Sequence, residues 1–322
     1  MVWARLVLLS LLLGLAGCAG TQFEPSYRIP RQVTLGTPVS AAVVNQFPAH
    51  VTAGGTVRLF DVYAQGGYSQ SVTEKLQIGL AANYEFAEFR FTGMNRFYNP
   101  RPWSDVYIFG AALPVMYNLK DKWNLSGKWT VLVVPLAQEG AEPGANWSRA
   151  VSYGGAVGVV YTFGKDRTIG VGVGALDNLA QAAVFPLIGV VWKFNEHLRL
   201  NTPYRAGPGG FGGLELTYIV NEDLELAVGV SYQSKRFRLS ERNINRAGIG
   251  EYDNIPLVAR VSYRLFRPLE VSVYGGASVF NQISIDDSKG NQLFKTHANV
   301  APFVGVGLSL KLDVQDGTAG GR

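Results

Sequence analysis

The chain has 322 residues, of which 29 are Lys or Arg and 24 are Asp or Glu, for a formal net charge of +5. Charged residues are 16% of the sequence, against about 25% in a typical soluble domain, and 38 residues are Gly. A mean hydropathy of +0.09 excludes a disordered chain, and the single cysteine excludes a disulfide framework and any site built from several cysteines.

Residues 1–17 have the pattern of an export signal. Arg5 precedes an apolar run at 6–15, which is too short for a transmembrane helix of about 20 residues. The run ends in Leu15-Ala16-Gly17-Cys18, which resembles the lipobox of bacterial lipoproteins. The resemblance implies cleavage before Cys18, a lipid on its sulfur and, with Ala19 next, delivery to the outer membrane. Ordinary signal cleavage with an incidental Cys18 is the alternative.

Large apolar residues then alternate with small or polar ones, the period-two pattern of strands with two unlike faces. A soluble sandwich also alternates, but its water-facing side carries charges, whereas here that side is mostly Gly, Ala, Ser and Thr. Aromatic residues lie near the ends of the apolar face, for example Tyr153, Tyr161 and Phe163. Such girdles are typical of a transmembrane barrel, which we favour over a sandwich.

Short and long breaks alternate between the predicted strands. Outer-membrane barrels likewise combine short periplasmic turns with longer outer loops, here near 49–55, 93–104, 138–149, 177–182, 204–210, 240–253 and 284–297. We therefore predict an all-β fold, a single antiparallel transmembrane β-barrel of about 14 strands, between roughly 12 and 16. The expected strands are 37–48, 56–71, 75–92, 105–119, 123–137, 150–163, 168–176, 183–194, 198–203, 211–220, 224–239, 255–265, 269–283 and 298–312.

The predicted organisation is a signal peptide at 1–17, a periplasmic tether at 18–35, an outer-membrane β-barrel at 36–312 and a disordered tail at 313–322. Gly305–Leu310 resembles the assembly signal of closing strands, although no terminal aromatic residue follows. This resemblance implies the barrel-assembly machinery as a partner. Basic residues between Lys235 and Arg246 favour contact with outer-membrane lipid and lipopolysaccharide over nucleic acid, and a solvated loop is the simpler interpretation. The oligomeric state stays open.

Three passages are similar to an uncharacterised family of Gram-negative outer-membrane β-barrels, classed as a domain of unknown function. They are the hairpin at 114–125, the strand at 186–194 and the loop-to-strand passage at 209–216. The resemblance spans about residues 55–312. It implies a barrel fold and location in the outer membrane of a Gram-negative bacterium, and it brings no known activity.

Few residues indicate catalysis. His50 and His297 lie at the outer ends of the first and last strands, which barrel closure makes neighbours, and Ser284 and Ser288 are near in sequence. This pair makes a lipid-acting rim enzyme a distant third hypothesis, and two unrelated loop histidines the simpler interpretation. We expect no enzyme, no cofactor and no metal site. The glycine-rich stretch 207–213 lacks the Gly-Lys-Ser/Thr of a phosphate loop, and Asp286 and Asp287 lack the spaced carboxylates of a calcium loop.

The inward strand faces carry charge. Because a charge facing lipid at mid-depth costs about 2–4 kcal/mol, charged strand residues should face water or each other. Basic residues outnumber acidic ones on this face, with small residues between them, so we expect a wet lumen and a passive or weakly anion-preferring channel for small solutes. A non-conducting structural or adhesive barrel is the alternative. The predicted lumen-facing charges are Lys128, Lys193, Arg260, Arg264, Glu215, Glu225 and Glu270.

Overall fold

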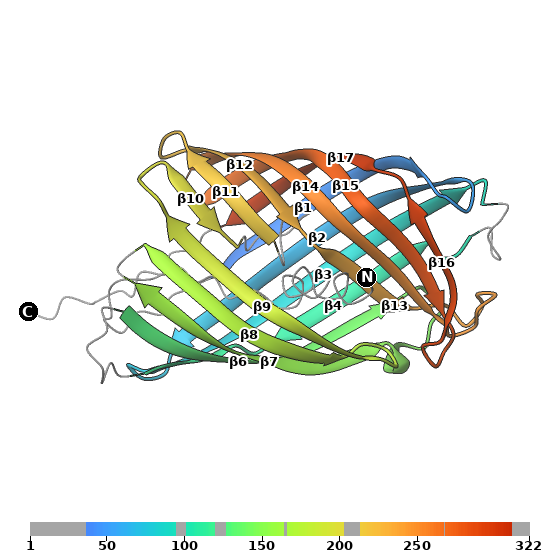
Figure 1. The fold of residues 1–322 in the computed structure, drawn as a ribbon, viewed down its shortest axis with the longest axis horizontal. Helices are drawn as coiled ribbons and strands as arrows, with labels where there is room; N and C mark the ends of the chain where they lie inside the picture. Colours follow the sequence, from blue (N-terminus) through green and yellow to red (C-terminus); the bar gives the residue numbers. More distant parts are fainter. Residues whose placement is uncertain are drawn as a thin grey trace, which may run out of the picture.

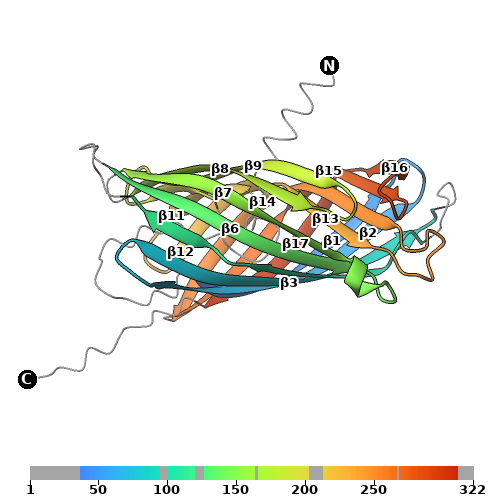
Figure 2. The same ribbon diagram turned by 90° about the horizontal axis from the view of Figure 1, so that it is seen from below.

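The structure, a computed structural model, describes residues 37–94, 101–119, 127–163, 166–202, 213–266 and 268–310. The predicted signal peptide, Cys18, the tether, Lys311 and the C-terminal tail lie outside the described residues. The described segments form one antiparallel sheet that closes on itself as an elongated barrel (Figures 1 and 2). No helix within these segments is long and apolar enough to cross a membrane.

The described residues contain seventeen strands. In three places two consecutive strands run in one line (β4 with β5, β12 with β13, β16 with β17), so the barrel wall has fourteen strand positions, which we call staves. A single turn of 3-10 helix, η1 (Trp147–Arg149), precedes β7. The strands are β1 (Thr37–His50), β2 (Thr56–Ser71), β3 (Leu76–Thr92), β4 (Asp105–Ala112), β5 (Val115–Asn118), β6 (Gly127–Ala141), β7 (Val151–Phe163), β8 (Arg167–Asp177), β9 (Ala182–Lys193), β10 (Leu198–Asn201), β11 (Gly213–Ile219), β12 (Leu224–Ser231), β13 (Gln233–Arg238), β14 (Ile249–Phe266), β15 (Leu269–Asp286), β16 (Gln292–Ala298) and β17 (Ala301–Leu310).

The first and last strands close the barrel. Val43 of β1 lies opposite Val306 of β17 on one side and opposite Val62 of β2 on the other. The predicted fold class, an antiparallel barrel of about fourteen strands, is thus confirmed. We call the end with the short connections, where Thr37 and Leu310 lie, the turn end, and the opposite end the loop end.

Strands extend into two predicted loops, which corrects the sequence interpretation. β14 begins at Ile249, within the expected loop 240–253, and β15 with β16 occupies most of the expected loop 284–297. These segments contain Glu251 and Asp286, which fall within the predicted loops 240–253 and 284–297. The structure instead pairs both carboxylates with a buried arginine, so their charge does not prevent strand formation.

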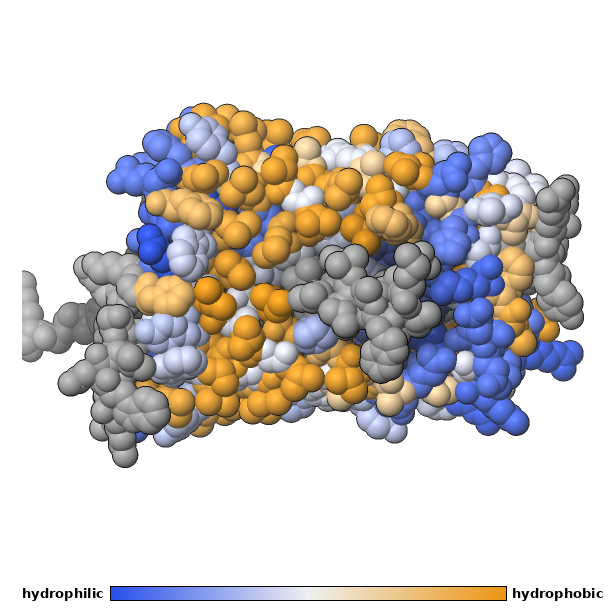
Figure 3. Space-filling view, viewed as in Figure 1, coloured by the Kyte–Doolittle hydropathy of each residue, from blue (hydrophilic) through white to orange (hydrophobic). Residues whose placement is uncertain are grey.

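The outer surface of the barrel carries a continuous apolar belt. Figure 3 shows hydrophobic residues across the middle of the barrel and hydrophilic ones at its ends. Five valines on the outer face are each at least half exposed: Val157 at 50%, Val171 at 60%, Val228 at 58%, Val273 at 56% and Val306 at 52%. Water-exposed surfaces do not usually present so much contiguous apolar area. The belt has the composition of a surface in contact with lipid acyl chains.

Aromatic rings border this belt near the turn end. On the outer face of β6–β9, Trp129 contacts Tyr161 at 4.6 Å between ring centroids, and Tyr161 contacts Phe163 at 4.9 Å. The row continues from Phe163 to Trp192 at 5.6 Å, where Arg167 lies over the indole ring. Tyr and Trp combine an apolar ring with a polar O–H or N–H group, which makes them favourable at the level of the lipid headgroups.

The belt yields a first prediction. Val171→Arg places a charge at the middle of β8 on the outer face, where it should cost about 2–4 kcal/mol in a bilayer. We expect a lower midpoint for heat-induced unfolding in lipid, measured by the mobility shift of the folded barrel on electrophoresis. Leu293→Arg is the matched control, since Leu293 is 56% exposed on β16 at the loop end. Equal losses in the two variants would contradict a membrane-embedded belt.

The loop-end half of the interior is filled by an apolar core. It forms where β13–β15 pack over the wall made by β1–β4. Phe89 of β3 contacts Trp103 at 5.6 Å and Tyr252 of β14 at 5.3 Å, and Phe237 of β13 contacts Trp103 at 5.2 Å. These side chains are at most 3% exposed. The expectation of a uniformly wet lumen is therefore wrong for this half of the barrel.

Candidate functional site: the barrel interior

β13 keeps its place beside β14 in the wall but bends in toward the interior at the loop end. Along β12 the neighbouring strand β11 pairs as far as Gly213 with Ser231. Beyond that point β13 keeps β14 as a neighbour and meets the distant strand β6 in parallel, at Arg238 opposite Ala141. Residues 235–238 are buried on both faces of the strand. A strand of a simple barrel wall would expose every second residue to lipid, so β13 divides the interior at the loop end.

One face of β13 is tied to the opposite wall by Lys235. Its ammonium forms an ion pair with Glu85 of β3, lies 3.4 Å from Asp61 Oδ2 of β2 and donates to the Tyr63 hydroxyl at 3.3 Å. Tyr63 in turn donates to Asp61 Oδ2 at 2.8 Å. The Lys235 side chain is 3% exposed. A buried ammonium is tolerated only because these partners replace its water.

The other face of β13 is tied to β14, β15 and the β8–β9 loop by Arg236. Its guanidinium donates to Glu251 at 2.7 Å, to Asp286 at 2.9 Å and to the Asn178 carbonyl at 3.0 Å. One planar fork thus joins three elements. Arg238 likewise donates to the backbone carbonyls of Arg149 and Ala247. Lys235, Arg236 and Arg238 are thus buried, whereas Arg242 and Arg246 of the same basic stretch are exposed.

Glu142 joins three loops above β13. Its carboxylate accepts the backbone N–H groups of Ser240 at 2.9 Å and Ser104 at 3.3 Å, and the side-chain amide of Asn243 at 3.5 Å. Burial raises the pKa of Glu142, which these hydrogen bonds partly oppose. The loop end is thus held together by buried polar contacts as well as by its apolar core.

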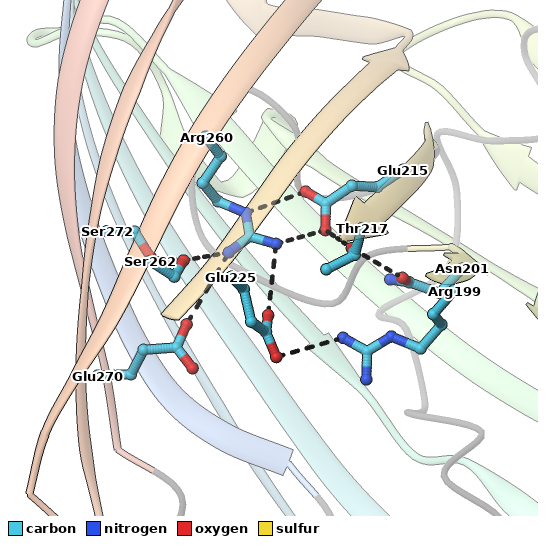
Figure 4. A network of polar contacts seen from close by, with 9 residues as sticks. All are labelled: Arg199, Asn201, Glu215, Thr217, Glu225, Arg260, Ser262, Glu270 and Ser272. Atoms are coloured by element: carbon cyan, nitrogen blue, oxygen red, sulfur yellow. Dashed lines mark hydrogen bonds and ion pairs between the residues drawn. The ribbon is translucent and has the colours of Figure 1, made fainter. Parts of the chain in front are cut away.

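A second network of charges fills the interior near the turn end (Figure 4). Arg260 of β14 points to Glu215 of β11, with Nη2 at 2.6 Å from Oε1 and Nε at 3.1 Å from Oε2. Glu225 of β12 and Glu270 of β15 lie 3.9 Å and 4.0 Å from the same guanidinium. Arg260 also donates to the Ser262 hydroxyl. The Arg260 side chain is 1% exposed.

Four of the seven predicted lumen charges, Glu215, Glu225, Arg260 and Glu270, thus meet in one network. Arg199 of β10 extends it, 3.7 Å from Glu225. The other three predicted charges, Lys128, Lys193 and Arg264, lie nearer the turn end and are partly or fully exposed. Lys193 is opposite Arg199, and Arg264 is opposite Glu270. The structure therefore separates enclosed, paired charges from charges that remain accessible to solvent.

The two rim histidines lie in adjacent segments. Val51 bridges Ala298, the Asn299 N–H donates to the His50 carbonyl, and the Thr52 N–H donates to the His297 carbonyl. The contacts are made by backbone, and both side chains are exposed. In the described part of the chain no group of three or more His, Cys, Asp or Glu side chains is placed to hold a metal ion.

Two cavities flank β13. The first, of about 210 Å³, lies inside the barrel between β13 and the wall, and its lining includes Gln65, Asn83, Gln138, Phe185 and Lys235. The second, of about 340 Å³, lies at the loop end and is lined in part by Arg149, Asp177 and Arg238. The hydrogen bond from Arg236 to the Asn178 carbonyl stands where the two linings adjoin.

Sequence reasoning missed Gln65, Asn83, Arg236, Glu251 and Asp286 as interior residues. The alternation along β2 carries a signal for the first of them. Asp61, Tyr63 and Gln65 follow the apolar Val57 and Leu59 on one strand face. A change from apolar to polar on an inward face marks the level at which the apolar core ends. No comparable signal exists for Arg236, whose place depends on β13 bending in toward the interior.

The closed antiparallel sheet, the apolar belt with its aromatic border and the charged interior define a transmembrane β-barrel. The model of the family "Domain of unknown function (DUF6268)" matches residues 107–311, and the chain belongs to this family. This confirms the family resemblance seen in the sequence.

Several solved structures are similar to this chain. The COG4313 outer membrane channel from Pseudomonas putida F1 is 10% identical, with a TM-score of 0.44, over 91% of this chain and 100% of that one. The toluene transporter TodX of P. putida is 10% identical, with a TM-score of 0.41, over 89% and 92% of the two chains. The KdgM porin is 9% identical, with a TM-score of 0.30, over 85% and 99%. No curated protein matches the chain.

Proposed function

We propose that this chain is an outer-membrane channel of low conductance for small solutes. The observation that carries the proposal is the cavity of about 210 Å³, lined in part by amide and charged side chains, inside a barrel with an apolar belt. A barrel that served only as an anchor would have no need of amides and charged groups around an internal space. The proposed path runs from the turn end past Lys128 and Lys193, through this cavity, to the loop-end cavity on the other side of Arg236.

A non-conducting barrel is the second candidate, and the apolar core of the loop end favours it. In that case the paired charges around β13 would serve only to stabilise a closed interior. We place the protein in the outer membrane of a Gram-negative bacterium, with the exposed Arg242 and Arg246 facing anionic lipopolysaccharide. An enzymatic role of His50 and His297 has no support beyond their adjacent backbones.

Planar-bilayer recording of the purified protein tests the choice between the two. We expect small, discrete conductance steps with a slight preference for anions, because Lys128, Lys193 and Arg264 are inward-facing basic side chains that remain accessible near the turn end. The preference should increase as the salt concentration falls, since the Debye length is about 8 Å at 0.15 M. A silent bilayer would favour the non-conducting barrel.

Selectivity offers a sharper test. Exchanging Lys128, Lys193 and Arg264 together for Glu should shift the reversal potential toward cations in a salt gradient. Lys289→Glu is the control, because Lys289 is exposed in the β15–β16 turn at the loop end, away from these three residues. An open channel whose reversal potential ignores the triple exchange would rule out conduction past these residues.

A further inference from the structure

The cavity beside β13 contains a polar group without a partner. Gln65 lies on the inward face of β2, opposite Ser40 of β1 and Asn83 of β3, and is 5% exposed. Neither its amide nitrogen nor its carbonyl oxygen has a hydrogen-bond partner, although both are shielded from solvent. Buried polar groups are nearly always paired, so an amide left in this state indicates a ligand or water that is bound in the cavity.

Two further side-chain amides line the cavity near Gln65. The side chains of Asn83 and Gln138 line the cavity from β3 and β6, and Tyr63 and Phe185 add aromatic surface. Gly110 of β4 makes room for Asn83, because a Cβ at that position would meet Asn83 Oδ1 at 2.2 Å. A side-chain amide offers a donor and an acceptor side by side, which matches two adjacent hydroxyl groups.

The charges around the cavity argue for a neutral ligand. The three charged side chains in its lining are Glu85, Lys235 and Arg236, and each is already engaged in an ion pair. A charged solute would lose its hydration there without meeting a free counterion. The amides and aromatic rings can instead contact the hydroxyl edge and the carbon face of a sugar ring.

We propose that this cavity is a binding site for a neutral, polyhydroxylated solute of monosaccharide size, with Gln65 as its principal hydrogen-bonding residue. The site deepens the channel proposal and rests on it only for its place along a transport path. Binding itself requires no conduction.

Isothermal titration of the purified, folded barrel in detergent tests the site. The probes are D-glucose and N-acetyl-D-glucosamine as neutral sugars, with D-glucosamine and D-glucuronate as charged counterparts. We expect saturable binding of at least one neutral sugar and at least tenfold weaker binding of both charged ones. Gln65→Leu should weaken the neutral sugar at least tenfold, and Gln138→Leu by a smaller factor.

Gln70→Leu is the matched control, because Gln70 is exposed on the same strand at the turn end. Folding of each variant is verified by its heat-dependent electrophoretic mobility, and Gln138→Leu keeps the test valid if Gln65→Leu does not fold. The proposal is overturned if no neutral sugar binds, if a charged probe binds more tightly, or if affinity is the same in the Gln65 and Gln138 variants as in Gln70→Leu. Conductance without sugar binding would remove the site alone, and sugar binding in a silent barrel would remove the channel alone.

Discussion

Lys235→Met is expected to raise the single-channel conductance several-fold and to lower the heat stability of the barrel. Lys235 is the contact that joins β13 to Asp61 and Glu85 on the opposite wall. Methionine is similar in length, so the substitution mainly removes the charge. It leaves two carboxylates close together in an enclosed site, which costs about 3–5 kcal/mol when one partner of a buried pair is removed. Their repulsion is relieved most directly if β13 moves away from β2 and β3, and this widens the cavity.

The same measurements on two further proteins separate this mechanism from general damage. Lys289→Met changes an exposed lysine at the loop end and should leave conductance and stability unchanged. Combining Lys235→Met with Asp61→Asn and Glu85→Gln removes all three charges, and replacing a whole buried ionic group by neutral residues is often without cost. The triple variant should therefore recover most of the lost stability. A Lys235→Met channel with the conductance of the unaltered protein would show that β13 does not limit the path.

The wall of the barrel could be predicted from the sequence because strand alternation is a local property. Val157 and Val171 face lipid while their neighbours Gly158 and Gly172 face inward, and a single strand suffices to see the difference. Fourteen staves follow from counting such strands between turns. The local pattern also places Glu215 and Arg260 on inward faces.

The interior could not be predicted to the same depth, because it depends on which distant side chains meet. Arg260 and Glu215 are 45 positions apart in sequence, and Lys235 and Glu85 are 150 apart. A period-two pattern gives the face of each residue but not its partner. Sequence reasoning therefore counts Arg260 among the lumen charges and places Lys235 in a basic stretch, without naming a partner for either. The structure pairs both with carboxylates, which leaves Lys128, Lys193 and Arg264 to carry the predicted anion preference.

The position of β13 is the feature that least resembles a regular barrel. In residues Lys235–Arg238, polar and apolar side chains do not alternate as they do in the other wall strands. Both faces of this stretch are buried because β13 leaves the neighbourhood of β11 and approaches β6. Phe237 then enters the apolar core, while Arg236 and Arg238 bind carboxylates and backbone carbonyls on the other face. A sequence pattern has no way to assign two buried faces to a stretch with three basic residues in four.

Arg260→Met is expected to be the most destabilising substitution in the turn-end half. Arg260 is the common partner of Glu215, Glu225 and Glu270, and of its neighbours Arg199 would remain in contact with Glu225. Loss of the central cation should cost about 3–5 kcal/mol, as for other buried pairs that lose one member. We expect a markedly lower midpoint of heat-induced unfolding in lipid and a smaller folded fraction, both measured by electrophoretic mobility.

The geometry of the network also predicts how far other residues can replace Arg260. Arg260→Lys keeps the charge but not the planar fork that reaches both oxygens of Glu215, so its stability should lie between those of the unaltered protein and Arg260→Met. Adding Glu215→Gln to Arg260→Met removes one of the three carboxylates and should restore part of the lost stability.

Arg264→Met is the matched control. Arg264 lies on the same strand face as Arg260 but closer to the turn end, where it is partly exposed. Exposed ion pairs contribute only about 0–1 kcal/mol to stability. If Arg264→Met destabilises the barrel as much as Arg260→Met, or if Glu215→Gln deepens the defect, the three carboxylates are not held together by Arg260.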